Sequence, residues 1–240
     1  MMGDNNGTLD ISLTNIKQLP TGLTIKGDLI LNQYIEQLPD NLRVEGDLDL
    51  SNTRADFKDT KGLYVGGNLI TGPMTRCINE PFGAGGNIDM RASIFLEKLP
   101  YVCMAEDIFI SSKYLKLTEE TSLACTNLCL AYSGITELPD VTTCEGNINL
   151  SHSAIQKLPA DFVVFGHLDL SYTPLTEYPR NLSVLGDLDI RGTSLPMQSN
   201  QLFVARNIIT DDGTFPYDNG YEIPIRFQEF VKYLHDVNHG

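Results

Sequence analysis

The chain repeats itself about every twenty residues, and this repeat limits its possible folds more than any other feature. The stretch Gly46–Leu50 (GDLDL) returns as Gly186–Ile190 (GDLDI). The residues in the glycine slot of successive copies are Gly7, Gly27, Gly46, Gly67, Gly86, Glu106, Thr126, Gly146, Gly166, Gly186 and Arg206. Neighbouring copies lie 19 to 21 residues apart. So regular a period predicts a solenoid, in which each coil packs only on its neighbours.

Each copy contains two short segments in which apolar and polar residues alternate, such as Leu168–Leu170 and Leu182–Val184. This period of two predicts short strands whose leucines point inward while the residues between them point outward. Many copies also carry Leu-Pro, as in Leu158–Pro159, and a residue before proline is disfavoured in the α region. We therefore expect a mainly-β coil with an extended far side and no full helix.

Stacking is required for stability. A coil has about six inward apolar side chains, each stabilising by roughly 1.5–3 kcal/mol when buried. Ordering its backbone costs roughly 1–2 kcal/mol per residue, so an isolated coil does not fold. We expect the solenoid over residues 1–210 and a C-terminal cap over 211–240. A helix is predicted at about 225–237, where Phe227, Phe230, Val231 and Leu234 recur with helical spacing.

The pattern L-x-L-x-x-T-x-I-x-x-L-P-x-x-L resembles the short, twenty-residue leucine-rich repeat over about residues 7–210. It is most similar to the bacterial type and to repeats in phage and bacterial proteins. The resemblance implies a right-handed stack of about eleven coils with a parallel β-sheet, and recognition of proteins by that sheet. The family usually has Asn or Cys where this chain has Thr or Ser, as at Thr53 and Thr173. A two- or three-sided β-helix therefore remains an alternative geometry.

The charge balance limits the partners. The chain has 17 Lys and Arg against 31 Asp and Glu, for a formal net charge of −14. This argues against direct binding of nucleic acid or an anionic membrane, and favours a basic partner or a cation. The five cysteines contain no C-x-x-C pair, so we expect free thiols, no zinc site and a reducing, cytoplasmic location. Neither a signal peptide nor a membrane span is predicted.

Two columns of residues are predicted to face outward from the main strands. The first includes Asp28, Asp47, Asp107 and Asp187, and the second includes Asp10, Asp49, Asp89, Phe109, Asp169 and Asp189. We predict that these residues other than Asp10 bind the partner. Neighbouring carboxylates ~4.8 Å apart repel by roughly 0.9 kcal/mol in water and roughly 3.5 kcal/mol at an effective dielectric constant of 20. The presence of neighbouring aspartates despite this repulsion suggests a cationic partner. The alternative is that each Asp only hydrogen-bonds turn backbone and keeps the sheet soluble.

The function predicted from these features is a non-enzymatic protein–protein interaction module without a cofactor, whose acidic face binds a basic protein surface. The resemblance to phage-type repeats suggests a phage-encoded inhibitor that mimics nucleic-acid charge on a host defence protein. A carbohydrate- or cation-binding β-solenoid is the alternative. A glycoside hydrolase using Asp169 and Asp189 is less favoured, because a flat solvated ladder offers no cleft to raise the pKa of one carboxyl.

Overall fold

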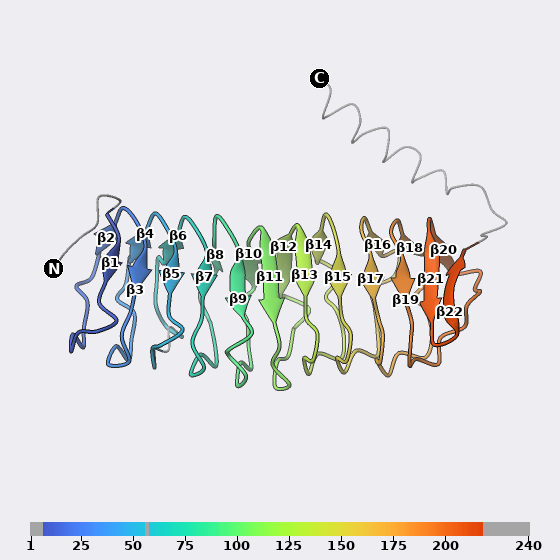
Figure 1. Ribbon diagram of the computed structural model, residues 1–240, viewed down its shortest axis with the longest axis horizontal. Coiled ribbons are helices and arrows are strands. Elements are labelled where there is room, and N and C mark those ends of the chain that lie inside the picture. Colours follow the sequence, from blue (N-terminus) through green and yellow to red (C-terminus); the bar gives the residue numbers. More distant parts are fainter. Residues whose placement is uncertain (1–6, 56–57, 218–240) are drawn as a thin grey trace, which may run out of the picture.

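The computed structural model describes residues 7–55 and 58–217, and within them it is a mainly-β parallel solenoid of about ten stacked coils. Figure 1 shows the coils side by side in a nearly straight row. The predicted solenoid is therefore confirmed. The helix predicted at about 225–237 lies outside the described residues. No helix in the described part of the chain is long and apolar enough to cross a bilayer.

The main sheet has twelve strands and extends along the whole row (Figure 1). Its parallel strands are β1 (Leu9–Asp10), β3 (Leu29–Ile30), β5 (Leu48–Asp49), β7 (Leu69–Ile70), β9 (Ile88–Met90), β11 (Asp107–Ile110), β13 (Asn127–Cys129), β15 (Ile148–Asn149), β17 (Leu168–Asp169), β19 (Leu188–Asp189) and β21 (Asn207–Thr210). Equivalent residues of successive coils are paired in register, as Leu168 is with Leu188. The alternation of inward leucines and outward polar residues is thereby preserved along the stack.

The main sheet ends in an antiparallel strand, β22 (Gly213–Pro216), which pairs with β21. Sequence analysis assigned this segment to the cap without predicting a strand. Pro216 can occupy β22 because an edge strand tolerates a residue without an N–H group.

A second side of the solenoid is formed by three shorter parallel sheets. Their strands are β2 (Thr24–Ile25), β4 (Arg43–Val44) and β6 (Tyr64–Val65); β8 (Phe82–Gly83), β10 (Val102–Met104), β12 (Ser122–Cys125) and β14 (Thr143–Cys144); and β16 (Val163–Val164), β18 (Leu182–Val184) and β20 (Leu202–Val204). On the third side, isolated parallel bridges such as Glu137–Lys157 connect the coils next to the Leu-Pro segments. The described coils thus have strands on two sides and isolated bridges on the third.

The core lies inside the coils and is built by the repeated apolar positions. Leu29, Leu48, Leu69, Leu168 and Leu188 are fully buried, as the alternation of strand residues predicts. Threonines take the place of the asparagine of leucine-rich repeats at the turn after the main strand. The hydroxyls of Thr53 and Thr173 donate to the carbonyls of Leu50 and Leu170, three residues earlier, at 2.9 and 2.7 Å.

Candidate functional site

The first outward column forms a hydrogen-bond ladder along the main sheet. Its members, called the Asx ladder below, are Asp28, Asp47, Asn68, Asn87, Asp107, Asn127, Asn147, His167, Asp187 and Asn207. Each side chain except that of Asn207, the last member, accepts the backbone N–H of the next member, one coil further on, at 2.7–3.1 Å. The acceptor in nearly every coil is an Asp or Asn oxygen, and His167 uses Nδ1. The column therefore stabilises the stack itself.

The glycine slot is explained by this ladder. A Cβ atom on Gly46 would lie 2.3 Å from Oδ1 of Asp28, and one on Gly67 would lie 2.2 Å from Oδ1 of Asp47. Real Cβ atoms do not come this close to a carboxylate. Glycine thus leaves space for the ladder side chain of the preceding coil.

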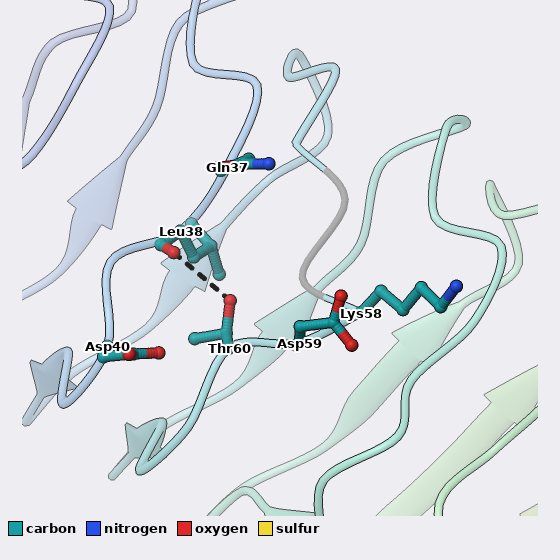
Figure 2. Close-up of a pocket in the computed structure, with 6 residues that line it drawn as sticks. All are labelled: Gln37, Leu38, Asp40, Lys58, Asp59 and Thr60. Carbon is teal, nitrogen blue, oxygen red and sulfur yellow. Dashed lines mark hydrogen bonds between the residues drawn. The ribbon is translucent and has the colours of Figure 1, made fainter.

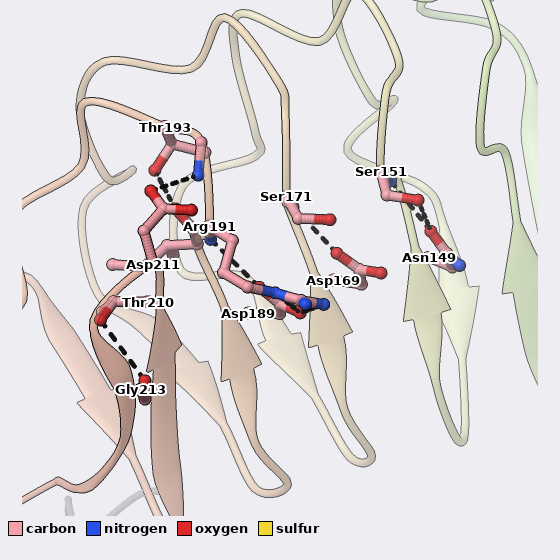
Figure 3. A network of polar contacts seen from close by, with 12 residues as sticks. Asn149, Ser151, Asp169, Ser171, Asp189, Arg191, Thr193, Thr210, Asp211 and Gly213 are labelled. Carbon is pink, nitrogen blue, oxygen red and sulfur yellow. Dashed lines mark hydrogen bonds and ion pairs between the residues drawn. The ribbon is translucent and has the colours of Figure 1, made fainter.

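The second outward column caps the turn that follows each main strand. Oδ1 of Asp49 accepts the N–H of Ser51 at 2.8 Å, and Oδ1 of Asp169 accepts that of Ser171 at 2.9 Å. Oδ1 of Asn149 accepts the N–H of Ser151 in the same way, and Figure 3 shows the turns of Asn149 and Asp169 side by side. Every acidic residue of the predicted site therefore has a backbone-binding role, as the alternative interpretation proposed.

Backbone bonding does not require a negative charge. Asn68 accepts an N–H within the same ladder as Asp47, and Asn149 caps the same turn as Asp49. Aspartate and asparagine are thus structurally equivalent in both columns. The charge at the aspartate positions is additional to what the fold needs.

Two of the predicted site residues are neutralised by neighbouring arginines. Arg91 pairs with Asp89, and Arg191 pairs with Asp189, with the closest N–O distance 2.6 Å in each case. Hydrogen bonding to Arg91 lowers the pKa of Asp89. Figure 3 shows the guanidinium of Arg191 lying along Asp189, and its charge also acts on Asp169. The face formed by β17 and β19 is therefore less acidic than its sequence suggests.

The N-terminal end of the main face is different. Asp10, Asp28, Asp47 and Asp49, called the acidic cluster below, surround Ile30 on strands and corners of coils one to three. Within residues 7–55 and 58–217, no member forms an ion pair. Hydrogen bonds from the side chain and N–H of Ser12 lower the pKa of Asp10. Sequence analysis placed Asp10 in the second outward column but did not include it among the predicted site residues, and it did not distinguish this end of the face.

The remaining predicted site residues are spread along the face. Asp107 follows Asn87 and precedes Asn127 in the ladder. Asp187 lies beside His167, and its Oδ2 is 3.3 Å from Nδ1 of the histidine. Phe109 is half-buried on the outward face, with the guanidinium of Arg91 5.1 Å from its ring centre. The nine residues therefore share one face, but they do not form one continuous acidic patch.

Two grooves lie away from these columns, on the turns of coils one to three. One, of about 320 Å³, is lined by Gln37, Leu38, Asp40, Lys58, Asp59 and Thr60, and Figure 2 shows the Thr60 hydroxyl donating to the Leu38 carbonyl. The other, of about 720 Å³, is lined by Lys17, Gln18, Gln33, Tyr34, Glu36, Gln37 and Arg54. No predicted site residue lines either groove. In the described residues, no three His, Cys, Asp or Glu side chains gather as metal ligands would.

A ring stack at the turns after the main strands was not foreseen. His152 lies between Tyr132 and Tyr172, with both centre-to-centre distances 4.6 Å and the rings nearly parallel. All three residues have positive φ, and a Cβ on Gly192 would lie 2.4 Å from the Tyr172 ring. The stacking covers both faces of His152 and one face of each tyrosine, and it links three successive coils.

Comparison of the chain with models of protein families, with curated proteins and with solved structures gives no match.

Proposed function

We propose that the protein is a non-enzymatic interaction module whose main-sheet face binds a basic protein surface, with the acidic cluster as the first point of contact. One observation carries the proposal. The cluster retains aspartates where asparagine would make the same backbone bonds, and none of them has an ion-pair partner in the described residues. Adjacent carboxylates repel each other, so a cationic partner relieves an existing cost.

The sharper form of this proposal is charge mimicry of nucleic acid. Asp28 and Asp47 stand on successive coils, whose strands lie about 4.8 Å apart, and phosphates of one DNA strand recur about every 3.4 Å along the helix axis. A lysine- and arginine-rich surface that binds phosphates can also contact these carboxylates. This would suit an inhibitor that occupies the nucleic-acid site of a host defence protein, in keeping with the resemblance to phage-type repeats.

The test compares two triple variants with the same change in charge. Asp28→Asn/Asp47→Asn/Asp49→Asn removes three charges from the cluster but keeps each side-chain acceptor. The matched control, Glu119→Gln/Glu120→Gln/Asp140→Asn, removes three exposed charges outside the main sheet. Each protein is used as bait in bacterial lysate at low and at high salt, and retained proteins are quantified by mass spectrometry.

We expect the wild type and the control to retain basic nucleic-acid-binding proteins at low salt, and to release them at high salt or with added duplex DNA. The cluster variant should retain about tenfold less, which corresponds to ~1.4 kcal/mol. Equal retention by all three proteins would show that the acidic cluster does not contribute to binding. If no basic protein is retained at low salt, the proposed function itself is wrong.

A further inference from the structure

A column of small apolar side chains points into the core from the second side of the solenoid. Its members, in register from coil to coil, include Ile25, Val44, Val65, Ala84, Cys125, Cys144, Val164, Val184 and Val204. Two neighbouring positions of this column are therefore cysteines where most other coils have valine. Both are buried, and both are free thiols.

The pairing of β12 with β14 aligns these two cysteines directly. Adjacent strands lie about 4.8 Å apart, which is within the Cα separation of about 4.4–6.8 Å that a disulfide spans. Both side chains are buried, and they occupy the same inward-facing position of neighbouring strands. No other cysteine is aligned with a cysteine in the described pairing, since Cys103 pairs with Leu123, Cys129 with Phe109 and Cys77 with Lys98.

The two thiols have different environments. The thiol of Cys144 lies 3.1 Å from the Thr126 carbonyl and 3.5 Å from the Asn147 carbonyl, to which it can donate. In the ionised form, the hydrogen bond from Cys125, together with the N–H groups of Gly146 and Leu128, lowers the pKa of Cys144 to about 7. The same bond to Cys144, with burial, raises the pKa of Cys125. The lowered pKa favours the thiolate at Cys144, and the strand pairing places Cys125 beside it as the resolving sulfur.

We propose that Cys125 and Cys144 are an oxidation site that forms a disulfide between neighbouring coils on exposure to a peroxide. The Cys144 thiolate attacks one peroxide oxygen, the O–O bond breaks, and the released hydroxide takes up a proton to become water. The sulfur of Cys125 then attacks the Cys144 sulfenic acid, forming the S–S bond and releasing a second water. In total, two thiols are oxidised and one hydrogen peroxide is reduced to two waters.

The disulfide would join coils six and seven beside the corner at Thr126. It closes a loop of about twenty residues, which restricts the unfolded chain. For a chain of this size, the melting temperature should rise by about 6–12 °C after oxidation and return to its original value after reduction.

The experiment treats the full chain with stoichiometric hydrogen peroxide and maps its peptides by mass spectrometry without reduction. We expect a Cys125–Cys144 cross-link that has lost two hydrogens, and the rise in melting temperature. Cys125→Val and Cys144→Val substitute the residue found at most other positions of the column, and neither should show the rise. The control Cys103→Val should still show it.

A cross-link between Cys103 and Cys125, or sulfinic acid at Cys144 without any cross-link, would overturn the proposal. The peptide map of the wild-type protein decides this even if a valine variant folds poorly.

Discussion

The corners of the solenoid are of two kinds, and the difference shows what the glycine of the repeat is for. At Gly46, Gly67, Gly86, Gly146 and Gly166, the Asx-ladder bond across the corner is 2.7–2.9 Å long. At Glu106, Thr126 and Arg206, the corresponding bond is 3.0–3.1 Å long. A side chain at the corner thus coincides with a longer contact between the ladder side chain and the next coil.

The strands also differ at the two kinds of corner. At Gly27, β2 ends at Ile25 and β3 begins at Leu29. At Thr126, β12 ends at Cys125 and β13 begins at Asn127, so the strands almost meet. The six glycines from Gly46 to Gly186 in this slot do not have positive φ, in contrast to Gly22 and Gly192. The corner glycine therefore provides space for a neighbouring coil and does not serve a left-handed turn.

The largest expected effect comes from filling a glycine corner. In Gly67→Ala, the new Cβ would lie 2.2 Å from Asp47 Oδ1 and 2.8 Å from the Gly46 carbonyl carbon. Overpacking and the damaged hydrogen bond together should lower the free energy of unfolding by about 3 kcal/mol, measured in urea. The control is Gly22→Ala, where φ is +73° but no atom lies within 4 Å, so about 1 kcal/mol of backbone strain is expected. Equal losses in the two variants would refute the steric explanation.

An intermediate effect comes from removing a ladder acceptor. Asp47 accepts the N–H and Nδ2 of Asn68 across a glycine corner at 2.7 and 3.0 Å, and Asp107 accepts those of Asn127 across the Thr126 corner at 3.0 and 2.8 Å. Asp47→Ala should cost about 2 kcal/mol and Asp107→Ala about 1 kcal/mol. The asparagine variants should stay within about 0.5 kcal/mol of the wild type, because they keep the acceptor. An aspartate-to-asparagine loss as large as the alanine loss would show that charge, not geometry, holds the ladder.

The smallest effect concerns the ion pair next to the Glu106 corner. Asp89→Asn keeps the acceptor for the Arg91 N–H but loses the pair with its guanidinium. Because the pKa of Asp89 is lowered in the folded state, the ion pair makes its full contribution to the free energy of unfolding above the usual carboxyl pKa of about 3.9. This contribution is lost as the pH falls through the lowered pKa of the folded state. The pair is largely solvated, so we expect a loss of less than about 1 kcal/mol at pH 7 and a smaller loss as the pH is lowered.

Urea midpoints of Asp89→Asn and wild type across this pH range test the prediction. Asp49→Asn is the control, since Asp49 caps the same kind of turn and has no ion pair among the described residues. A pH-independent loss in Asp89→Asn would assign the effect to packing against Phe109 instead.

The candidate site was predicted only in part. The outward direction of Asp28, Asp47 and Asp49 follows from strand alternation, which is a local property, and it is confirmed by their half-buried positions next to buried leucines. The sequence pattern does not show in the same way which carboxylates remain without an ion-pair partner. Arg91 and Arg191 reach Asp89 and Asp189 through side-chain conformations that depend on the turn they stand on. The role of these residues in partner binding stays a prediction.

The sequence by itself determined the solenoid, its period and its inward and outward faces, because every coil repeats the same local pattern of strand, corner and Leu-Pro. Only the tertiary structure decided why glycine precedes Asp or Asn, since the side chain that needs the space belongs to the coil before, about twenty residues away. The His152 ring stack and the alignment of Cys125 with Cys144 depend on the same register between coils. Contacts between stacked copies are set by register and spacing in three dimensions, and neither is encoded in a single repeat.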